Sequence, residues 1–245
     1  MPEMSVDDLH GTLIGASAAH GWQTQYFGDE PAKVTVRGWP KTLVLYLHSW
    51  SSTFEQDYGS PGLDALTDCI IVAPNFGGWN DHPQGAGHPA QLERIDRCRL
   101  ALLAEFPMLE KTLVFGQSGG GYVGLMYMAA YPGAVQGASL WVFPYDLADW
   151  WTQKIGFRPS LEACLGGTPS TVPAEYLARS PMSKTITGVE LKLNGSPDDV
   201  QIPFAHQEAA AARFTPGVPV RSFSGGHITQ WDVTLSQLQS MQAAA

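Results

Sequence analysis

Short apolar runs alternate with longer segments of helical character along most of the chain. Five runs are predicted as buried strands of a parallel sheet: 42–48, 69–73, 112–115, 138–143 and 189–193, of which the first two are continuously apolar. Two earlier segments, 22–27 and 33–37, alternate polar and apolar residues and are predicted as edge strands, and 220–223 is predicted as a last strand.

Helices are predicted between these strands. One begins near Pro89 and carries an apolar stripe, and others are predicted at 120–130, 204–214 and 229–241. A repeated strand–helix pattern predicts the α/β class, with a mostly parallel central sheet and helices on both of its faces. The length of 245 residues fits one domain of this kind, so residues 1–245 are predicted to form a single unit.

Two segments depart from the strand–helix repeat. Residues 145–185 are irregular and contain Trp150 and Trp151, so they are predicted as a small insertion over the carboxyl edge of the sheet rather than a separate domain. Near the start of the chain, residues 5–8 resemble a capping box that opens a short helix.

The net charge of −9 argues against a nucleic-acid partner and against an anionic membrane surface, because both would be repelled. Residues 1–20 lack the basic and apolar regions of a signal peptide, and no apolar run is long enough to span a membrane. We therefore expect a soluble, cytoplasmic protein, although a secreted mature form would look the same. The oligomeric state is left open.

Three cysteines are present, and none belongs to a CxxC pair. Cys69 lies in a predicted strand and Cys98 in a predicted helix, so both are interpreted as small buried hydrophobic residues. A bridge between Cys69 and Cys98 is the alternative. The sequence has no metal-binding motif of the HExxH type and no phosphate loop ending in Gly-Lys-Ser/Thr, so neither a metal nor a cofactor is expected.

Residues 116–120, with the sequence GQSGG, match the G-x-S-x-G pattern of a nucleophilic serine on a tight turn. The motif directly follows the strand predicted at 112–115 and directly opens a helix, which is the context that this pattern requires. Side chains at Gly116 and Gly120 would collide with the backbone of such a turn. Ser118 is therefore the candidate nucleophile, and the Gly119 N–H is a candidate donor to an oxyanion.

A serine nucleophile needs an imidazole base and a carboxylate that orients it, and in hydrolases with this turn the acid precedes the histidine in the chain. Only His206 and His227 follow Ser118. His227 lies in a glycine-rich loop between the last predicted strand and helix, so it is the candidate base. His206 lies within a predicted helix and is interpreted as a surface or supporting histidine.

The candidate acid lies in the loop that follows the strand predicted at 189–193. That loop contains two adjacent carboxylates, Asp198 and Asp199. Asp198 is preferred because it comes three residues after Gly195, and Asp199 is the alternative. The carboxylate that is not the acid is expected to cap the following helix or to face solvent.

These residues resemble the α/β-hydrolase superfamily, and more closely its prolyl-oligopeptidase-like branch of single-domain hydrolases and esterases. The stretches that carry the resemblance extend from residue 47 to residue 206: LHSWSS at 47–52, APNFGG at 73–78, GQSGGGYVGLMYMAAYP at 116–132, ASLWVFPYDLADWW at 138–151, RSPMS at 179–183 and IPFAH at 202–206. The resemblance implies a Ser118–Asp198–His227 triad without a metal or a cofactor.

In this superfamily the second donor to the oxyanion comes from the loop after the first buried strand. Here that loop begins with His48 and Ser49, where the family usually has His-Gly. The backbone N–H of Trp50 is the candidate donor, with the Ser49 N–H as the alternative. His48 is predicted to be structural, forming hydrogen bonds within the loop.

Carboxylic esters are the favoured substrates, and acylated carbohydrates and aromatic esters are hypotheses for their class. Only about 40 residues precede the first buried strand, too few for the gating domain of the oligopeptidases. Aromatic residues on loops after the strands are candidates for substrate binding: Tyr145, Trp150, Trp151 and Trp79. A small core packed within the insertion is the alternative for the tryptophans. A peptidase and a non-catalytic binding module are the alternative functions.

Overall fold

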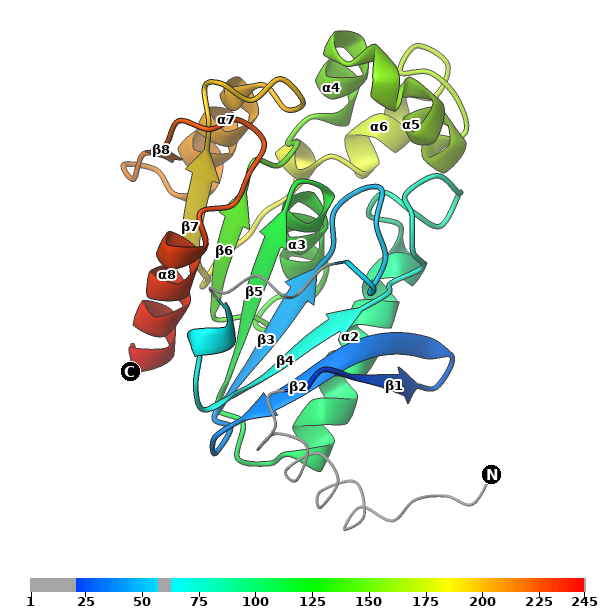
Figure 1. Ribbon diagram of the computed structural model, residues 1–245. Helices are drawn as coiled ribbons and strands as arrows, with labels where there is room; N and C mark the ends of the chain where they lie inside the picture. The colour runs from blue at the N-terminus through cyan, green and yellow to red at the C-terminus, as the bar shows by residue number, and fades with distance from the viewer. Residues whose placement is uncertain (1–20, 57–62, 245) are drawn as a thin grey trace.

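One eight-stranded sheet organises the protein, whose computed structural model describes residues 21–56 and 63–244 (Figure 1). The strands lie in the order β1-β2-β4-β3-β5-β6-β7-β8. Their bounds are β1 Gln23–Phe27, β2 Glu30–Arg37, β3 Thr42–Leu47, β4 Cys69–Pro74, β5 Lys111–Gln117, β6 Gly137–Trp141, β7 Glu190–Gly195 and β8 Arg221–Ser222.

The sheet is mostly parallel, as predicted. All neighbours from β4 through β3 to β8 pair in parallel, whereas β1 pairs with β2 and β2 with β4 in antiparallel register. The prediction that 33–37 forms an edge strand is wrong. β2 lies between β1 and β4, and its side chains from Val34 to Arg37 are buried.

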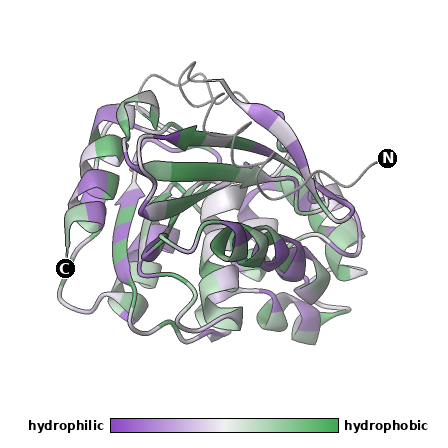
Figure 2. Ribbon diagram, turned by 90° about the horizontal axis from the view of Figure 1, so that it is seen from below, coloured by the Kyte–Doolittle hydropathy of each residue, from purple (hydrophilic) through white to green (hydrophobic). Residues whose placement is uncertain are grey.

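Helices cover both faces of the sheet and create two hydrophobic cores. The core on one face joins α2 (Pro89–Glu105), α3 (Gly119–Ala130) and α7 (Phe204–Phe214) to the strands. The core on the other face joins η1 (Leu63–Ala65) and α8 (Trp231–Ala243) to β3, β4 and β5. In Figure 2 the central strands are predominantly hydrophobic and the outer helices are mixed. The predicted α/β architecture is therefore confirmed.

The predicted insertion forms a cluster of short helices above the carboxyl ends of the strands (Figure 1). Its elements are α4 Leu147–Gln153, η2 Ile155–Phe157, α5 Arg158–Leu165, α6 Pro173–Ala178 and η3 Pro181–Ser183. Trp150 is its central side chain: it is fully buried, its ring packs against Phe157, and its Nε1 donates to Gln201 O at 3.0 Å. The insertion therefore has no separate core: Trp150 belongs to the larger core that also contains residues of α2 and α3.

Cys69, Cys98 and Cys164 are all buried and free, so the Cys69–Cys98 bridge does not form. Burial raises the pKa of the Cys69 thiol to about 12, which keeps this sulfur protonated and unreactive. Within the described ranges, no helix is long and apolar enough to cross a membrane. The helix predicted from residues 5–8 lies outside the described residues.

Truncating the buried ring of Trp150 should destabilise the protein strongly. We expect Trp150→Ala to lower the free energy of unfolding by about 3–5 kcal/mol, because a large cavity replaces a fully buried side chain. Trp39 is 62% exposed, so Trp39→Ala should change stability by less than about 0.5 kcal/mol. Urea unfolding of both variants would measure this, and equal stabilities for the two would contradict the packing described.

Candidate active site

Ser118 occupies a strained turn between β5 and α3. Its φ of 55° and ψ of −122° are unusual for a residue with a side chain. Its N–H donates to Trp141 O at 2.8 Å, and its carbonyl accepts from Tyr122 N at 3.1 Å. These bonds fix the turn to the neighbouring strand and to the first turn of α3, and the side chain is almost fully buried.

The glycines around Ser118 are required by close backbone contacts. A Cβ on Gly120 would lie 2.0 Å from Leu47 O, and a Cβ on Gly116 would lie 2.4 Å from the carbonyl of Gly120. A Cβ on Gly119 would lie 2.4 Å from the backbone nitrogen of Trp50. The absence of these side chains lets the start of α3 approach the end of β3 and the loop that follows it.

His227 is held by a buried carboxylate, and that carboxylate is Asp199. The Nδ1 of His227 lies 2.7 Å from Asp199 Oδ2, and the side chain of Asp199 has no exposed surface. The other oxygen of Asp199 accepts from the backbone N–H groups of Gln201 and Ile202 at 2.7 and 3.0 Å. Because a carboxylate only accepts, Nδ1 carries the proton and Nε2 keeps a free lone pair for a base.

The assignment of Asp198 as the partner of His227 is corrected by this geometry. A turn closed by the bond from Asp199 N to Ser196 O, 3.1 Å, leaves the side chain of Asp198 exposed and buries that of Asp199. Asp198 instead accepts from Gly225 N at 3.3 Å through Oδ2, and Ser196 Oγ accepts from Gly226 N at 3.1 Å. Asp198 therefore supports the loop that carries His227.

Gln117 connects the loop of His227 to the turn of Ser118. Its Nε2 donates to His227 O at 3.2 Å, and its Oε1 accepts from Thr229 Oγ1 at 3.0 Å. Because Gln117 directly precedes Ser118, these two bonds place the backbone of the His227 loop beside the turn of Ser118. Within the described residues, the Ser118 hydroxyl and the His227 ring make no direct hydrogen bond. Such bonds are often long in unliganded enzymes and shorten when substrate binds.

Two backbone N–H groups meet beside Ser118. Those of Trp50 and Gly119 lie next to each other, and neither donates to an acceptor in the described part of the chain. The alternative donor, the Ser49 N–H, is already occupied because it donates to Gln56 Oε1 at 2.7 Å. This geometry favours Trp50 over Ser49 as the partner of Gly119 in binding an oxyanion.

His48 supports the loop that carries Trp50, as predicted. Its two ring nitrogens lie 2.9 Å from Ser49 O and 2.8 Å from Asn75 O, and its ring stacks on Phe76 at 3.8 Å between centroids. Burial lowers the pKa of His48 to about 4, although the two carbonyls act in the opposite direction. The imidazole is therefore neutral and structural at neutral pH.

His206 is more important to the structure than the sequence suggested. It is 3% exposed, so the expectation of a surface side chain is wrong. Its Nδ1 accepts from the backbone nitrogens of Tyr145 and Asp146, and its Nε2 lies 3.1 Å from Asp149 Oδ2. Burial lowers its pKa. The ring thus joins α7 to the start of the insertion.

The four aromatic residues predicted to bind substrate have different surroundings. Trp150 is fully buried in the main core and Tyr145 is 8% exposed, so the prediction that they line an open site is corrected. Trp151 is partly buried, with Arg158 stacked 4.1 Å from its ring centre. Trp79 is 55% exposed and lines a cavity of about 350 Å³ beside Ser51. Trp79 is thus the best placed of the four to contact a ligand.

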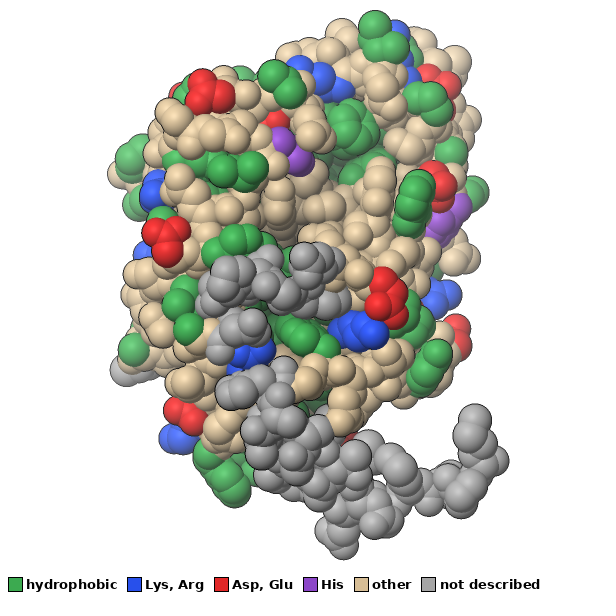
Figure 3. Space-filling model, in the orientation of Figure 1, with side chains coloured by type: hydrophobic (Ala, Val, Ile, Leu, Met, Phe, Trp, Pro, Cys, Tyr) green, Lys and Arg blue, Asp and Glu red, His purple; other side chains and the backbone are tan. Residues whose placement is uncertain are grey.

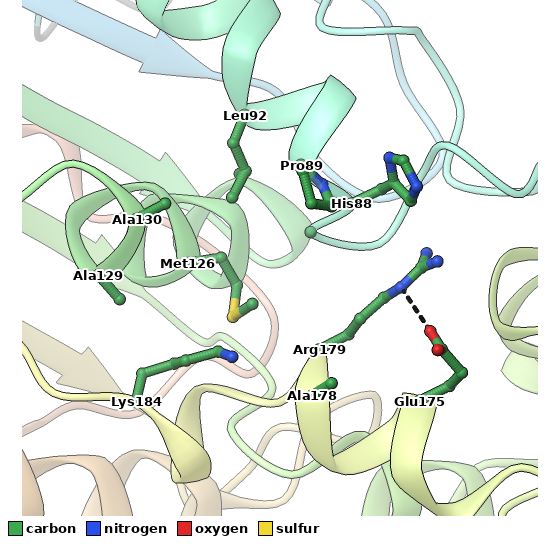
Figure 4. Close-up of a pocket in the computed structure, with 11 residues that line it drawn as sticks. His88, Pro89, Leu92, Met126, Ala129, Ala130, Glu175, Ala178, Arg179 and Lys184 are labelled. Carbon is green, nitrogen blue, oxygen red and sulfur yellow. Dashed lines mark ion pairs between the residues drawn. The ribbon is translucent and has the colours of Figure 1, made fainter.

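A separate cavity of about 470 Å³ lies between the start of α2, the middle of α3 and α6 (Figure 4). Arg179 points across it and forms an ion pair with Glu175 at 3.3 Å. None of the residues around it belongs to the Ser118 site.

On the face shown in Figure 3, an exposed histidine lies beside acidic atoms and near hydrophobic side chains.

Comparison with solved structures shows that the chain has the α/β-hydrolase fold. An acylaminoacyl peptidase from Pyrococcus horikoshii matches 90% of this chain at a TM-score of 0.68 and 12% identity. A puromycin-hydrolyzing peptidase from Mycobacterium tuberculosis matches 91% at a TM-score of 0.71 and 17% identity. The chain spans only 40% and 38% of the length of these two peptidases.

A third similar structure is of comparable length. It is a protein named as a candidate lipase from Acinetobacter baumannii AYE, with a TM-score of 0.61 and 13% identity. The match covers 99% of this chain and 98% of that one. No family model and no curated protein sequence matches the chain. The comparisons therefore define the fold, which agrees with the resemblance found in the sequence.

Acid should destabilise the protein through His48. The folded-state pKa of about 4 lies below the value of 6.5 for a free histidine, so the unfolded chain binds more protons between these pH values. The stabilisation is present above about pH 6.5 and is lost as the pH falls toward 4, by at most roughly 3 kcal/mol. Urea unfolding at several pH values should show a shallower acid dependence for His48→Gln than for the parent protein. Parallel pH curves would contradict this account.

Proposed function

We propose that the protein is a serine hydrolase that cleaves carboxylic esters through a covalent acyl-enzyme. The observation that carries the proposal is the 2.7 Å contact between the buried carboxylate of Asp199 and His227 Nδ1. Gln117 connects the loop of His227 to the turn of Ser118 by a hydrogen bond. An imidazole oriented in this way has its Nε2 free to accept a proton. A serine on a strained, glycine-rich turn is the group that such a base would activate.

The chemistry follows from these positions. Ser118 Oγ attacks the carbonyl carbon of the ester while its proton passes to His227 Nε2, and the buried Asp199 carboxylate stabilises the resulting imidazolium. The negative charge that develops on the carbonyl oxygen is bound by the N–H groups of Trp50 and Gly119. The tetrahedral intermediate then expels the alcohol, which takes the proton from His227. Water attacks the acyl-enzyme in the same way and regenerates the Ser118 hydroxyl.

Esters are favoured over peptides as substrates because an alkoxide leaves more readily than an amine. Acylated carbohydrates and aromatic esters are the classes proposed first, because the exposed ring of Trp79 lines a cavity beside Ser51, which directly follows Trp50. A peptidase is the second candidate, since two of the similar solved structures are named as peptidases. Ser118, His227 and Asp199 would carry either reaction.

A fluorophosphonate probe combined with a substrate panel tests the proposed function. We expect the probe to label the parent protein at Ser118 and to leave Ser118→Ala unlabelled, as mass spectrometry would show. The parent should hydrolyse nitrophenyl esters, and feruloyl esters and acetylated xylan would identify the ester class. Activity confined to peptide amides would favour the peptidase. A folded protein that is not labelled would instead be a non-catalytic binding module.

Replacing each of the two neighbouring aspartates by asparagine should separate their roles. Asp199→Asn should lower kcat by roughly 10⁴-fold, because an amide at this position no longer favours the tautomer with Nδ1 protonated. Asp198→Asn is the matched control. It removes one exposed contact to Gly225 and should lower kcat by less than about tenfold. The opposite order of the two effects on ester hydrolysis would show that Asp198 is the acid.

A further inference from the structure

The cavity beside Trp79 lies between three segments that are distant in the chain. It is bounded by the loop after β3, by the loop that follows β4, and by η2 and the start of α5 in the insertion. Its volume is about 350 Å³, which is enough for a compact part of a small molecule. The residues that line it include Ser51, Trp79, Asn80, Asp81, Phe157 and Ser160.

Residues in the wall of this cavity contact Trp50, the proposed oxyanion donor. Ser51 follows Trp50 in the chain, and Asn80 donates to Trp50 O through its backbone nitrogen at 3.0 Å and its Nδ2 at 3.2 Å. Ser160 Oγ accepts from Trp50 Nε1 at 3.1 Å. Ser51, Asn80 and Ser160 therefore all adjoin Trp50. The backbone nitrogen of Trp50 lies against Gly119. The cavity wall is thus joined to the loop that carries the proposed oxyanion donor.

The side chains around this cavity favour a positive charge. The ring of Trp79 is 55% exposed, and the carboxylate of Asp81 is exposed and forms no ion pair within the described ranges. Phe157 adds a second aromatic ring. Among the residues that the structure describes, no lysine, arginine or histidine lines the cavity. An aromatic face next to an unpaired carboxylate attracts an ammonium group, whereas a carboxylate or phosphate would be repelled.

We propose that this cavity binds a cationic group of the substrate, a primary or quaternary ammonium, between Trp79 and Asp81. The inference rests on the proposed function, because it names the class of ester that the Ser118 site would accept. Trp79 contributes its ring face and Asp81 its negative charge. Neither residue takes part in bond cleavage, so both determine specificity rather than chemistry.

A pair of esters of nearly equal shape tests this inference. Acetylcholine carries a trimethylammonium group where 3,3-dimethylbutyl acetate carries a neutral tert-butyl group. We expect kcat/KM to favour the cationic ester by about tenfold, which corresponds to the strength of a partly exposed cation–π contact. Trp79→Leu and Asp81→Asn should each lower this ratio by about threefold or more. Raising the salt concentration should also lower it.

The matched control is Glu110→Gln, which removes the same amount of charge as Asp81→Asn. Glu110 is exposed and pairs with Lys41, directly before the start of β5, whereas Ser118 follows the end of that strand. Its substitution should leave the ratio between the two esters unchanged. Equal kcat/KM values for the two esters, or a preference that is as large in both Trp79→Leu and Asp81→Asn as in the parent, would overturn the inference.

Binding of choline, measured by calorimetry, gives a readout that is independent of catalysis. Choline should bind the parent more tightly than 3,3-dimethylbutanol, and Trp79→Leu and Asp81→Asn should each reduce this difference. Equal binding of the two alcohols would overturn the cationic subsite even if Ser118 were labelled by the fluorophosphonate, so that the proposed function would still stand. Failure of Ser118 to be labelled would instead overturn the proposed function.

Discussion

The close approach of two backbone segments is the constraint on which the candidate site depends. The start of α3 lies against the end of β3 and the loop after it, and side chains at Gly119 and Gly120 would collide with Trp50 and Leu47. At this contact Ser118 has a strained conformation and the backbone nitrogen of Trp50 lies against Gly119. The nucleophile and the proposed oxyanion donors therefore arise from one packing arrangement.

The other half of the site is organised by a second contact between loops. Ser196, Asp198 and Asp199, after β7, all bind the glycine-rich loop that carries His227. Gln117 then joins that loop to the turn of Ser118. Glycines allow the loop to approach, and the buried carboxylate of Asp199 fixes the imidazole. Loss of either contact would separate the proposed base from the proposed nucleophile without changing the sheet.

Features determined by local sequence could be predicted. The turn at Ser118 requires a strand, a helix and glycines in immediate succession, and the sequence shows all of them. His227 could be located because its loop is rich in glycine. The choice between Asp198 and Asp199 could not be made from the sequence. It depends on which of the two side chains is directed inward by the turn that the bond from Asp199 N to Ser196 O closes. Counting residues from Gly195 carries no information on that direction.

Features determined by tertiary packing could not be predicted. The place of β2 between β1 and β4 depends on strand pairing, which its alternating pattern does not encode. The burial of Trp150 depends on the neighbouring helices of the insertion. From the residue type and its position in the sequence alone, a substrate-binding side chain and a buried one were equally plausible. His206 is buried because the insertion begins at its ring, and this contact joins residues about 60 positions apart.

A crystal structure of the protein after reaction with a fluorophosphonate would test the central claim most directly. We predict a phosphorus atom bonded to Ser118 Oγ, with its phosphoryl oxygen accepting hydrogen bonds from the backbone nitrogens of both Trp50 and Gly119. His227 should remain bonded to Asp199 and turn its Nε2 toward Ser118. An adduct on another residue, or a phosphoryl oxygen directed away from these two nitrogens, would contradict the account.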